Sequence, residues 1–171
     1  MKITLLLTTF IFLSFAATSQ DTSALTRQPY LLTLAVDKQT TYEESITAIP
    51  YLFPNRSMQI YPGETVYLEV EVKDANIISM KAVKEVTKPS STLVIKFKQN
   101  SDKGVHQSMA LTVENPFDLV LGYEALMFPL KTKKFVKTSI YPVQPGLAGI
   151  EMWPDLITTL ALGNWKFKPR S

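Results

Sequence analysis

The chain has 171 residues, of which 46% are hydrophobic and 19% are charged, and its formal net charge is +3. This composition is typical of one globular domain and excludes a globally disordered chain. The small net charge argues against a nucleic-acid-binding domain, and the absence of cysteine excludes a disulfide framework, a thiol nucleophile and cysteine-ligated zinc.

The first 19 residues have the pattern of an export signal. Lys2 gives a positive start, residues 3–15 are mostly apolar, and Ala17 and Ser19 are the small residues that a signal peptidase accepts. We therefore expect residues 1–19 to be a cleaved signal peptide and the mature protein to be exported, either periplasmic or secreted. The apolar run is shorter than the ~20 residues that span a bilayer, and no later stretch approaches that length. A membrane-spanning chain is therefore not expected, although a retained N-terminal anchor is the alternative.

Residues 20–28 are polar and lack periodicity, which predicts a flexible mature N-terminus. The first strand is expected at 30–36, where apolar and other residues alternate with a period of two. Residues 37–44 are interpreted as a polar connection. Two prolines interrupt the apolar segment 46–53, so we expect an irregular or edge segment there.

The middle of the chain contains the clearest strand patterns. A short strand is predicted at 57–61, and stronger ones at 65–72 and 92–98. The segment 77–86 is ambiguous, because its alternation favours a strand while Asn76 is a possible cap for a short helix. We favour the strand because its neighbours are strands. The residues expected to face the core from the two clearest strands are Val66, Leu68, Val70, Val72, Leu93, Ile95 and Phe97.

The stretch 109–127 is a strand, a turn and a second strand. Apolar residues alternate through 109–113, and Pro116 then ends the ladder because proline has no amide hydrogen to donate. Proline also keeps Asn115 out of helical dihedral angles, and Asp118 adds a further turn-forming side chain. The alternation resumes at 119–127, so the stretch predicts a strand, a turn and a second strand.

The C-terminal third continues in the same style. A strand is predicted at 135–141, residues 147–153 are expected to form a short extended segment, and a closing strand lies within 154–167. Its apolar residues change parity, which predicts a β-bulge near Gly163–Asn164. The alternative for 154–162 is a short helix that starts at a proline and ends at a glycine. The residues on either side of the parity change are Leu160 and Leu162, then Trp165 and Phe167.

Together these segments predict about eight short strands, with turn signals at intervals of ~8–12 residues. The expected fold is all-β, a single antiparallel β-sandwich domain over residues 29–168. Over residues 30–167 the spacing of strands and turns resembles that of the immunoglobulin-like sandwiches of exported bacterial proteins. The resemblance implies an immunoglobulin-like fold and carries over no functional residue.

No residue is predicted to be catalytic. His106 is the only imidazole that a nucleophile could use as its base, and it follows a turn without the glycines of a nucleophile elbow. Glu69 and Glu71 share one face of a strand about 6–7 Å apart, a pair that glycosidases also use. We interpret His106 as a surface or strand-edge residue and the two carboxylates as a solvated face.

No metal site and no cofactor are predicted either. Glu114, Asn115 and Asp118 offer oxygen atoms of the kind that calcium prefers, but their spacing is not that of a known calcium loop. Oxygen-bearing side chains are common in turns, so we interpret these three residues as turn formers.

A basic cluster is the candidate interaction patch. It consists of Lys131, Lys133, Lys134 and Lys137, with Trp153 as a possible aromatic anchor. If the lysines share one sheet, they would attract an anionic polymer or lipid headgroups. The alternative, which we favour, is that such lysines keep sheet edges from pairing with other chains. The remaining basic residues of this kind are Lys96, Lys98, Lys166, Lys168 and Arg170.

Several aromatic residues lie outside the cleanest strands and are expected to belong mainly to the core or its rim. The function predicted from these observations is an exported, non-enzymatic module for protein binding or envelope structure, whose partner is an envelope or extracellular protein. The alternative is a periplasmic accessory protein that binds a small hydrophobic or anionic ligand. The aromatic residues in question are Tyr30, Tyr51, Phe53, Tyr61 and Trp165.

Overall fold

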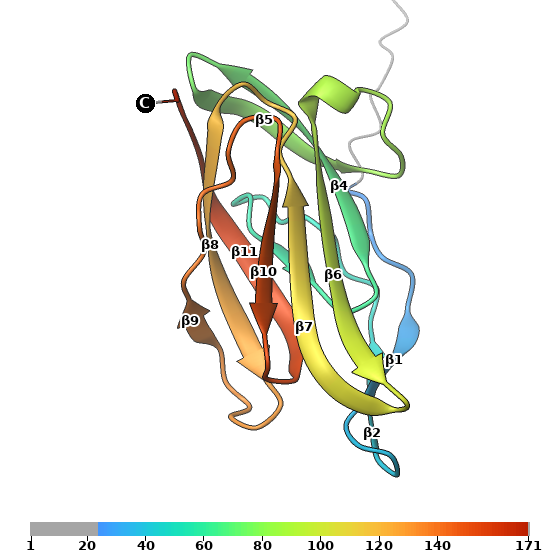
Figure 1. Cartoon of the computed structure of the whole chain (residues 1–171). Helices are drawn as coiled ribbons and strands as arrows, with labels where there is room; N and C mark the ends of the chain where they lie inside the picture. Colours follow the sequence, from blue (N-terminus) through green and yellow to red (C-terminus); the bar gives the residue numbers. More distant parts are fainter. Residues whose placement is uncertain (1–23, 171) are drawn as a thin grey trace, which may run out of the picture.

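The structure, a computed structural model, describes residues 24–170 (Figure 1). The predicted signal peptide and the first residues of the mature terminus lie outside the described residues. Within the described part, all regular elements are β-strands apart from one 3-10 turn. They are β1 (Tyr30–Ala35), β2 (Thr41–Ile46), β3 (Met58–Ile60), β4 (Thr65–Lys73), β5 (Asn76–Val83), η1 (Pro89–Ser91), β6 (Thr92–Asp102), β7 (Val105–Glu114), β8 (Val120–Pro129), β9 (Val136–Thr138), β10 (Ala148–Trp153) and β11 (Ile157–Lys168).

The strands form two larger antiparallel sheets and one hairpin. The five-stranded sheet has the order β10-β7-β6-β4-β5, the four-stranded sheet has the order β3-β11-β8-β9, and β1 pairs only with β2. Buried residues of both larger sheets belong to one hydrophobic cluster. The all-β, antiparallel class is therefore confirmed, and the two sheets enclose a common core as in a β-sandwich.

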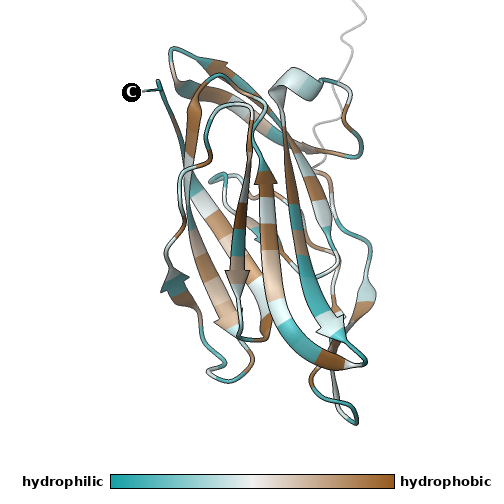
Figure 2. Ribbon diagram, in the orientation of Figure 1, coloured by the Kyte–Doolittle hydropathy of each residue, from teal (hydrophilic) through white to brown (hydrophobic). Residues whose placement is uncertain are grey.

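The core is built by the alternation that the sequence displays. Apolar and polar residues follow one another as bands along the strands (Figure 2). Because successive side chains of a strand point to opposite faces, each strand places every second residue in the core. The residues on which this expectation depended are at most 2% exposed: Val66, Leu68, Leu93, Ile95 and Leu111.

Both ambiguous segments are strands. Residues 77–86 contain most of β5, and 157–168 form β11, so the helical alternatives are wrong. In β11 the register against β8 shifts between Gly163 and Lys166, and Asn164 has a positive φ of 53°. This is the predicted bulge, and it allows residues before and after it to point into the same core.

Several predicted boundaries are wrong. The connection at 37–44 contains the start of β2, whose inward positions include a tyrosine and a glutamate and thus lack an apolar pattern. The polar turn after 98 is instead the continuation of β6 to Asp102, and β9 is shorter than the predicted strand at 135–141. The structure has eleven strands rather than about eight, and the strand residues missed in β2 and at the end of β6 are mainly polar.

The described beginning of the chain is held in place rather than flexible. Thr26 forms a β-bridge with Pro50, and Arg27 is only 1% exposed. The Arg27 guanidinium forms two hydrogen bonds with the Glu64 carboxylate, at 2.8 and 3.2 Å, and lies 4.8–4.9 Å from the ring centres of Tyr51 and Tyr61. The predicted flexible segment 20–28 thus ends in a buried ion pair.

Gly149 of β10 allows the Val143 side chain to pack closely against the strand. A Cβ built on Gly149 would lie 2.7 Å from Cγ2 of Val143, a side chain that is itself buried. We expect Gly149→Ala to lower the free energy of unfolding by about 1–3 kcal/mol, because Val143 has to move. Gly122→Ala is the control: its Cβ would meet only the Lys166 carbonyl oxygen at 3.8 Å, so urea denaturation should show no loss.

Residues 24–170 contain no helix that is long and apolar enough to cross a membrane.

Candidate functional site at the open edge of β10

The two larger sheets have four edge strands, and three of them are unsuited to pairing with another chain. β3 and β9 have three residues each, and the middle residue of β9 is Lys137. β5 is longer, but its register shifts opposite Glu71 and Val72, which leaves Ile78 unpaired, and it carries Lys81. Short length, lysines and bulges are the means by which natural sheets prevent edge-to-edge association.

The fourth edge strand, β10, has none of these protections. Its six residues, Ala-Gly-Ile-Glu-Met-Trp, include no lysine and no proline, and its register with β7 is continuous. Glu151 is its only charged residue, and this side chain accepts a hydrogen bond from the backbone N–H of Tyr141 at 2.9 Å. The single charge is therefore engaged within the molecule instead of guarding the edge.

The hydrogen bond just before β10 shows which backbone groups of this strand bond to β7 and which point away from it. The N–H of Asn115 donates to the carbonyl oxygen of Leu147 at 2.9 Å, so that pair is a hydrogen-bonded one. Because such pairs alternate in an antiparallel ladder, the backbone groups of Gly149, Glu151 and Trp153 bond to β7. The N–H and C=O groups of Ala148, Ile150 and Met152 therefore point to the open edge, where no described residue provides a backbone partner.

Apolar side chains surround these open backbone groups. Ile150 is 64% exposed and Met152 is 60% exposed, both on the outer face of β10. Leu147, just before the strand, is 59% exposed, and Tyr141, on the neighbouring segment, is 81% exposed. Four of the nine large hydrophobic residues that are exposed in the described chain thus gather at this edge.

An open groove of about 560 Å³ begins where β10 begins. It crosses the ends of β10, β7 and β6 toward η1, and most of its lining side chains are apolar. The groove and the exposed edge are contiguous, since both include the start of β10. The apolar side chains that line the groove are Val86, Pro89, Val94, Pro116, Leu147 and Ala148.

The predicted basic patch is only partly assembled. Lys131, Lys133 and Lys134 are exposed in the turn after β8, which is joined to the segment after β10 by the Leu130 N–H···O=C Leu156 hydrogen bond. Lys137 forms an ion pair with Glu124 at 3.3 Å. The Trp153 indole is half-buried and donates to the Thr138 hydroxyl at 3.0 Å, so it is not a protruding anchor.

The only histidine, His106, is held by hydrogen bonds to neighbouring segments. Nε2 of Gln99 lies 2.9 Å from Nδ1 of His106, and Gln99 also exchanges two hydrogen bonds with the backbone of Ala35. Since the Gln99 amide donates, Nδ1 accepts, and the proton on Nε2 is donated to the Pro154 carbonyl oxygen at 3.0 Å. His106 therefore joins three segments and has no ring nitrogen left for a nucleophile.

Two of the candidate carboxylates, Glu69 and Glu114, form ion pairs with lysines. Glu69 contacts Lys88 and Lys81 at 3.0 and 3.1 Å, and hydrogen bonds from these two lysines lower its pKa. Glu114 pairs with Lys96 at 2.7 Å. Within the described chain no three acidic or histidine side chains gather as metal ligands.

The expected turn at Asn115 is confirmed. The Asn115 side chain also forms hydrogen bonds to a segment distant in the sequence. Asn115 is 2% exposed, and its Nδ2 donates to the carbonyl oxygens of Leu119, Val143 and Gln144 at 2.8–3.3 Å. Its Oδ1 accepts from the N–H of Phe117. Asn115 thereby fastens the segment that leads into β10 to the turn between β7 and β8.

The aromatic residues are mainly internal, as expected. Tyr51 and Tyr61 flank Arg27, and the Trp165 ring stacks on Tyr123 at 5.1 Å between centroids. Burial and the nearby Glu64 carboxylate raise the pKa of Tyr30, since both disfavour its anion.

The sequence signal for this site is that the extended segment Leu147–Trp153 contains neither lysine nor proline, the residues that usually protect a sheet edge. Compared with protein-family models, with curated proteins and with solved structures, the chain has no match.

Proposed function

We propose that this protein is an exported, non-enzymatic β-sandwich module that binds an extended segment of an envelope or extracellular protein along β10. The observation that carries the proposal is the set of open backbone groups at Ala148, Ile150 and Met152, framed by exposed apolar side chains. An extended segment added there would gain main-chain hydrogen bonds, and side-chain pockets would give it specificity.

The groove at the start of β10 is suited to supply such a pocket. It is open and largely apolar, and its volume of about 560 Å³ is ample for one or two large side chains of the bound segment. We also propose the immunoglobulin-like class for the sandwich, on the spacing of its strands and turns, and the export signal at residues 1–19, on its sequence pattern.

Selection of peptides from a displayed random library on the immobilised protein tests the proposal. We expect the selected peptides to alternate apolar residues with a period of two and to bind at least tenfold more weakly to Ile150→Lys, because the lysine would be desolvated by the added strand. Ile78→Lys on β5 is the matched control, since Ile78 is 52% exposed on another edge strand.

Peptides that bind both variants equally well would contradict the proposal. A second copy of the chain is the competing occupant of the edge. Sedimentation that shows a dimer, dissociated by Ile150→Lys and not by Ile78→Lys, would assign β10 to self-association instead.

A further inference from the structure

A second site lies on the four-stranded sheet and is independent of β10. Gly122 is the third residue of β8, with Lys166 of β11 directly opposite it in the register. On its other side, the bridge between Leu121 and Val143 places Pro142 beside Gly122. Since glycine has no side chain, the outer face of the sheet has a notch between a lysine and a proline.

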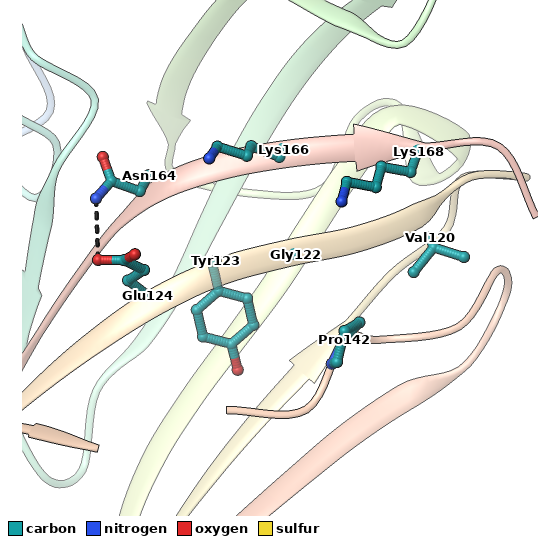
Figure 3. A pocket seen from close by; sticks show the side chains of 8 residues that line it. All are labelled: Val120, Gly122, Tyr123, Glu124, Pro142, Asn164, Lys166 and Lys168. Atoms are coloured by element: carbon teal, nitrogen blue, oxygen red, sulfur yellow. Dashed lines mark hydrogen bonds between the residues drawn. The ribbon is translucent and has the colours of Figure 1, made fainter. Parts of the chain in front are cut away.

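The notch opens into a pocket of about 230 Å³ (Figure 3). Lys168, opposite Val120, extends along the same face of β11 as Lys166. Figure 3 shows Lys166 along β11, Lys168 reaching into the space between β11 and β8, and Val120 and Pro142 on the far side of β8. The pocket therefore has two cations along one wall and apolar groups along the other.

The positive charge of this pocket is only partly offset within the described chain: Asn164 and Lys137 lower the pKa of Glu124 most, and the charge of Lys166 adds to this effect. Lys166 and Lys168 form no ion pair with a described residue. Glu124 is the one acidic residue of the pocket, and its two oxygens are already engaged by Asn164 at 3.1 Å and Lys137 at 3.3 Å. An anion would thus be attracted to the end of the pocket that is distant from Glu124.

Packing does not explain why position 122 is a glycine. Glycine in the interior of a strand costs stability, and its φ here is not in the left-handed region. A Cβ would have only one ordinary contact, 3.8 Å from the Lys166 carbonyl oxygen. Glycine within a strand often marks a bulge or the close approach of a ligand or another backbone; Gly122 lies opposite the end of the β11 bulge and leaves open space on the outer face.

We propose that this notch binds a small organic phosphate. The phosphate would lie between Lys166 and Lys168, and its compact organic part would lie over Gly122 between Val120 and Pro142. A phosphate monoester carries a charge of about −1.5 to −2 at pH 7, which matches two lysines better than a single carboxylate does. The volume equals that of about eight water molecules and so accommodates a ligand of one small ring.

Titration of the full protein with phenyl phosphate, followed by amide chemical shifts, tests this site. We expect saturable shifts at Gly122 and Lys166, weaker binding of benzoate and no binding of phenol. Lys166→Gln/Lys168→Gln should bind about tenfold more weakly, as two exposed charge contacts are lost. Lys96→Gln/Lys98→Gln is the matched control, because it removes two outward lysines from the central strand β6 of the other sheet.

The Gly122→Val variant distinguishes a loss of phenyl phosphate binding from a loss of folding stability. Valine favours strands and would fill the notch, so this variant should be at least as stable as the wild type to urea and should lose phenyl phosphate binding. Equal weakening in the two double-lysine variants, shifts confined to other residues, or no saturable shift at millimolar phenyl phosphate would each overturn the proposal. None of these results bears on peptide binding at β10.

Discussion

Glu64→Gln should cost about 3–5 kcal/mol of the free energy of unfolding, which is among the largest effects of any single substitution in this chain. The Arg27 side chain has no exposed surface and the Glu64 side chain is 8% exposed, so the ion pair is removed from water. Glutamine keeps the size of the side chain but removes its charge. The guanidinium would then remain buried between two tyrosines without an anion.

Urea denaturation of the wild type and Glu64→Gln measures this loss. Glu114→Gln is the matched control, because it breaks the pair with Lys96, whose members are 44% and 48% exposed. That substitution should cost less than ~1 kcal/mol. Equal losses for the two variants would mean that the Arg27–Glu64 pair does not hold the beginning of the chain against the sandwich.

Asn115→Asp should cost about 2–4 kcal/mol, although the two side chains have the same shape. The substitution replaces the Nδ2 donor by an oxygen that faces three carbonyl oxygens, in a position that is 2% exposed. The segment around Val143 would lose its attachment to the turn between β7 and β8. Since this segment leads into β10, amide exchange should also accelerate at Gly149.

Asn100→Asp is the control for this experiment. The Asn100 amide donates to the Ser108 hydroxyl at 3.0 Å, and that hydroxyl can rotate and donate to an aspartate instead. We expect its loss of stability, measured by urea denaturation, to be below ~1 kcal/mol. A cost at Asn115 no larger than that at Asn100 would contradict the role given to the buried amide.

The strands of the core could be predicted because burial imposes a period of two on them. Val66, Leu68, Leu93 and Ile95 follow this period and are buried, and the change of parity after Leu162 correctly indicated a bulge. β2 escaped prediction because its pattern of Tyr42 and Glu44 is not apolar. An apolar alternation with a period of two is visible only in the part of a strand that contacts the core.

The candidate sites depend on contacts between distant segments, which no local pattern reveals. Arg27 lies in a polar stretch and is buried because Glu64 and Tyr61 reach it from elsewhere in the chain. β3 pairs with β11 only at Leu160–Leu162, so Lys166 and Lys168 lie on a part of β11 that has β8 as its only strand neighbour, which no local pattern of the sequence indicates. Likewise, the sequence predicts only a short extended segment at 147–153, and its position at an open edge depends on the order of strands in the sheet.

Amide hydrogen exchange along β10 tests the open edge most directly. In the protein alone, the amides of Ala148, Ile150 and Met152 should exchange rapidly, while those of the intervening residues are protected by hydrogen bonds to β7. A bound peptide should then protect the first three. Uniform protection of all six β10 amides in the protein alone would contradict the account, because the edge would already be paired.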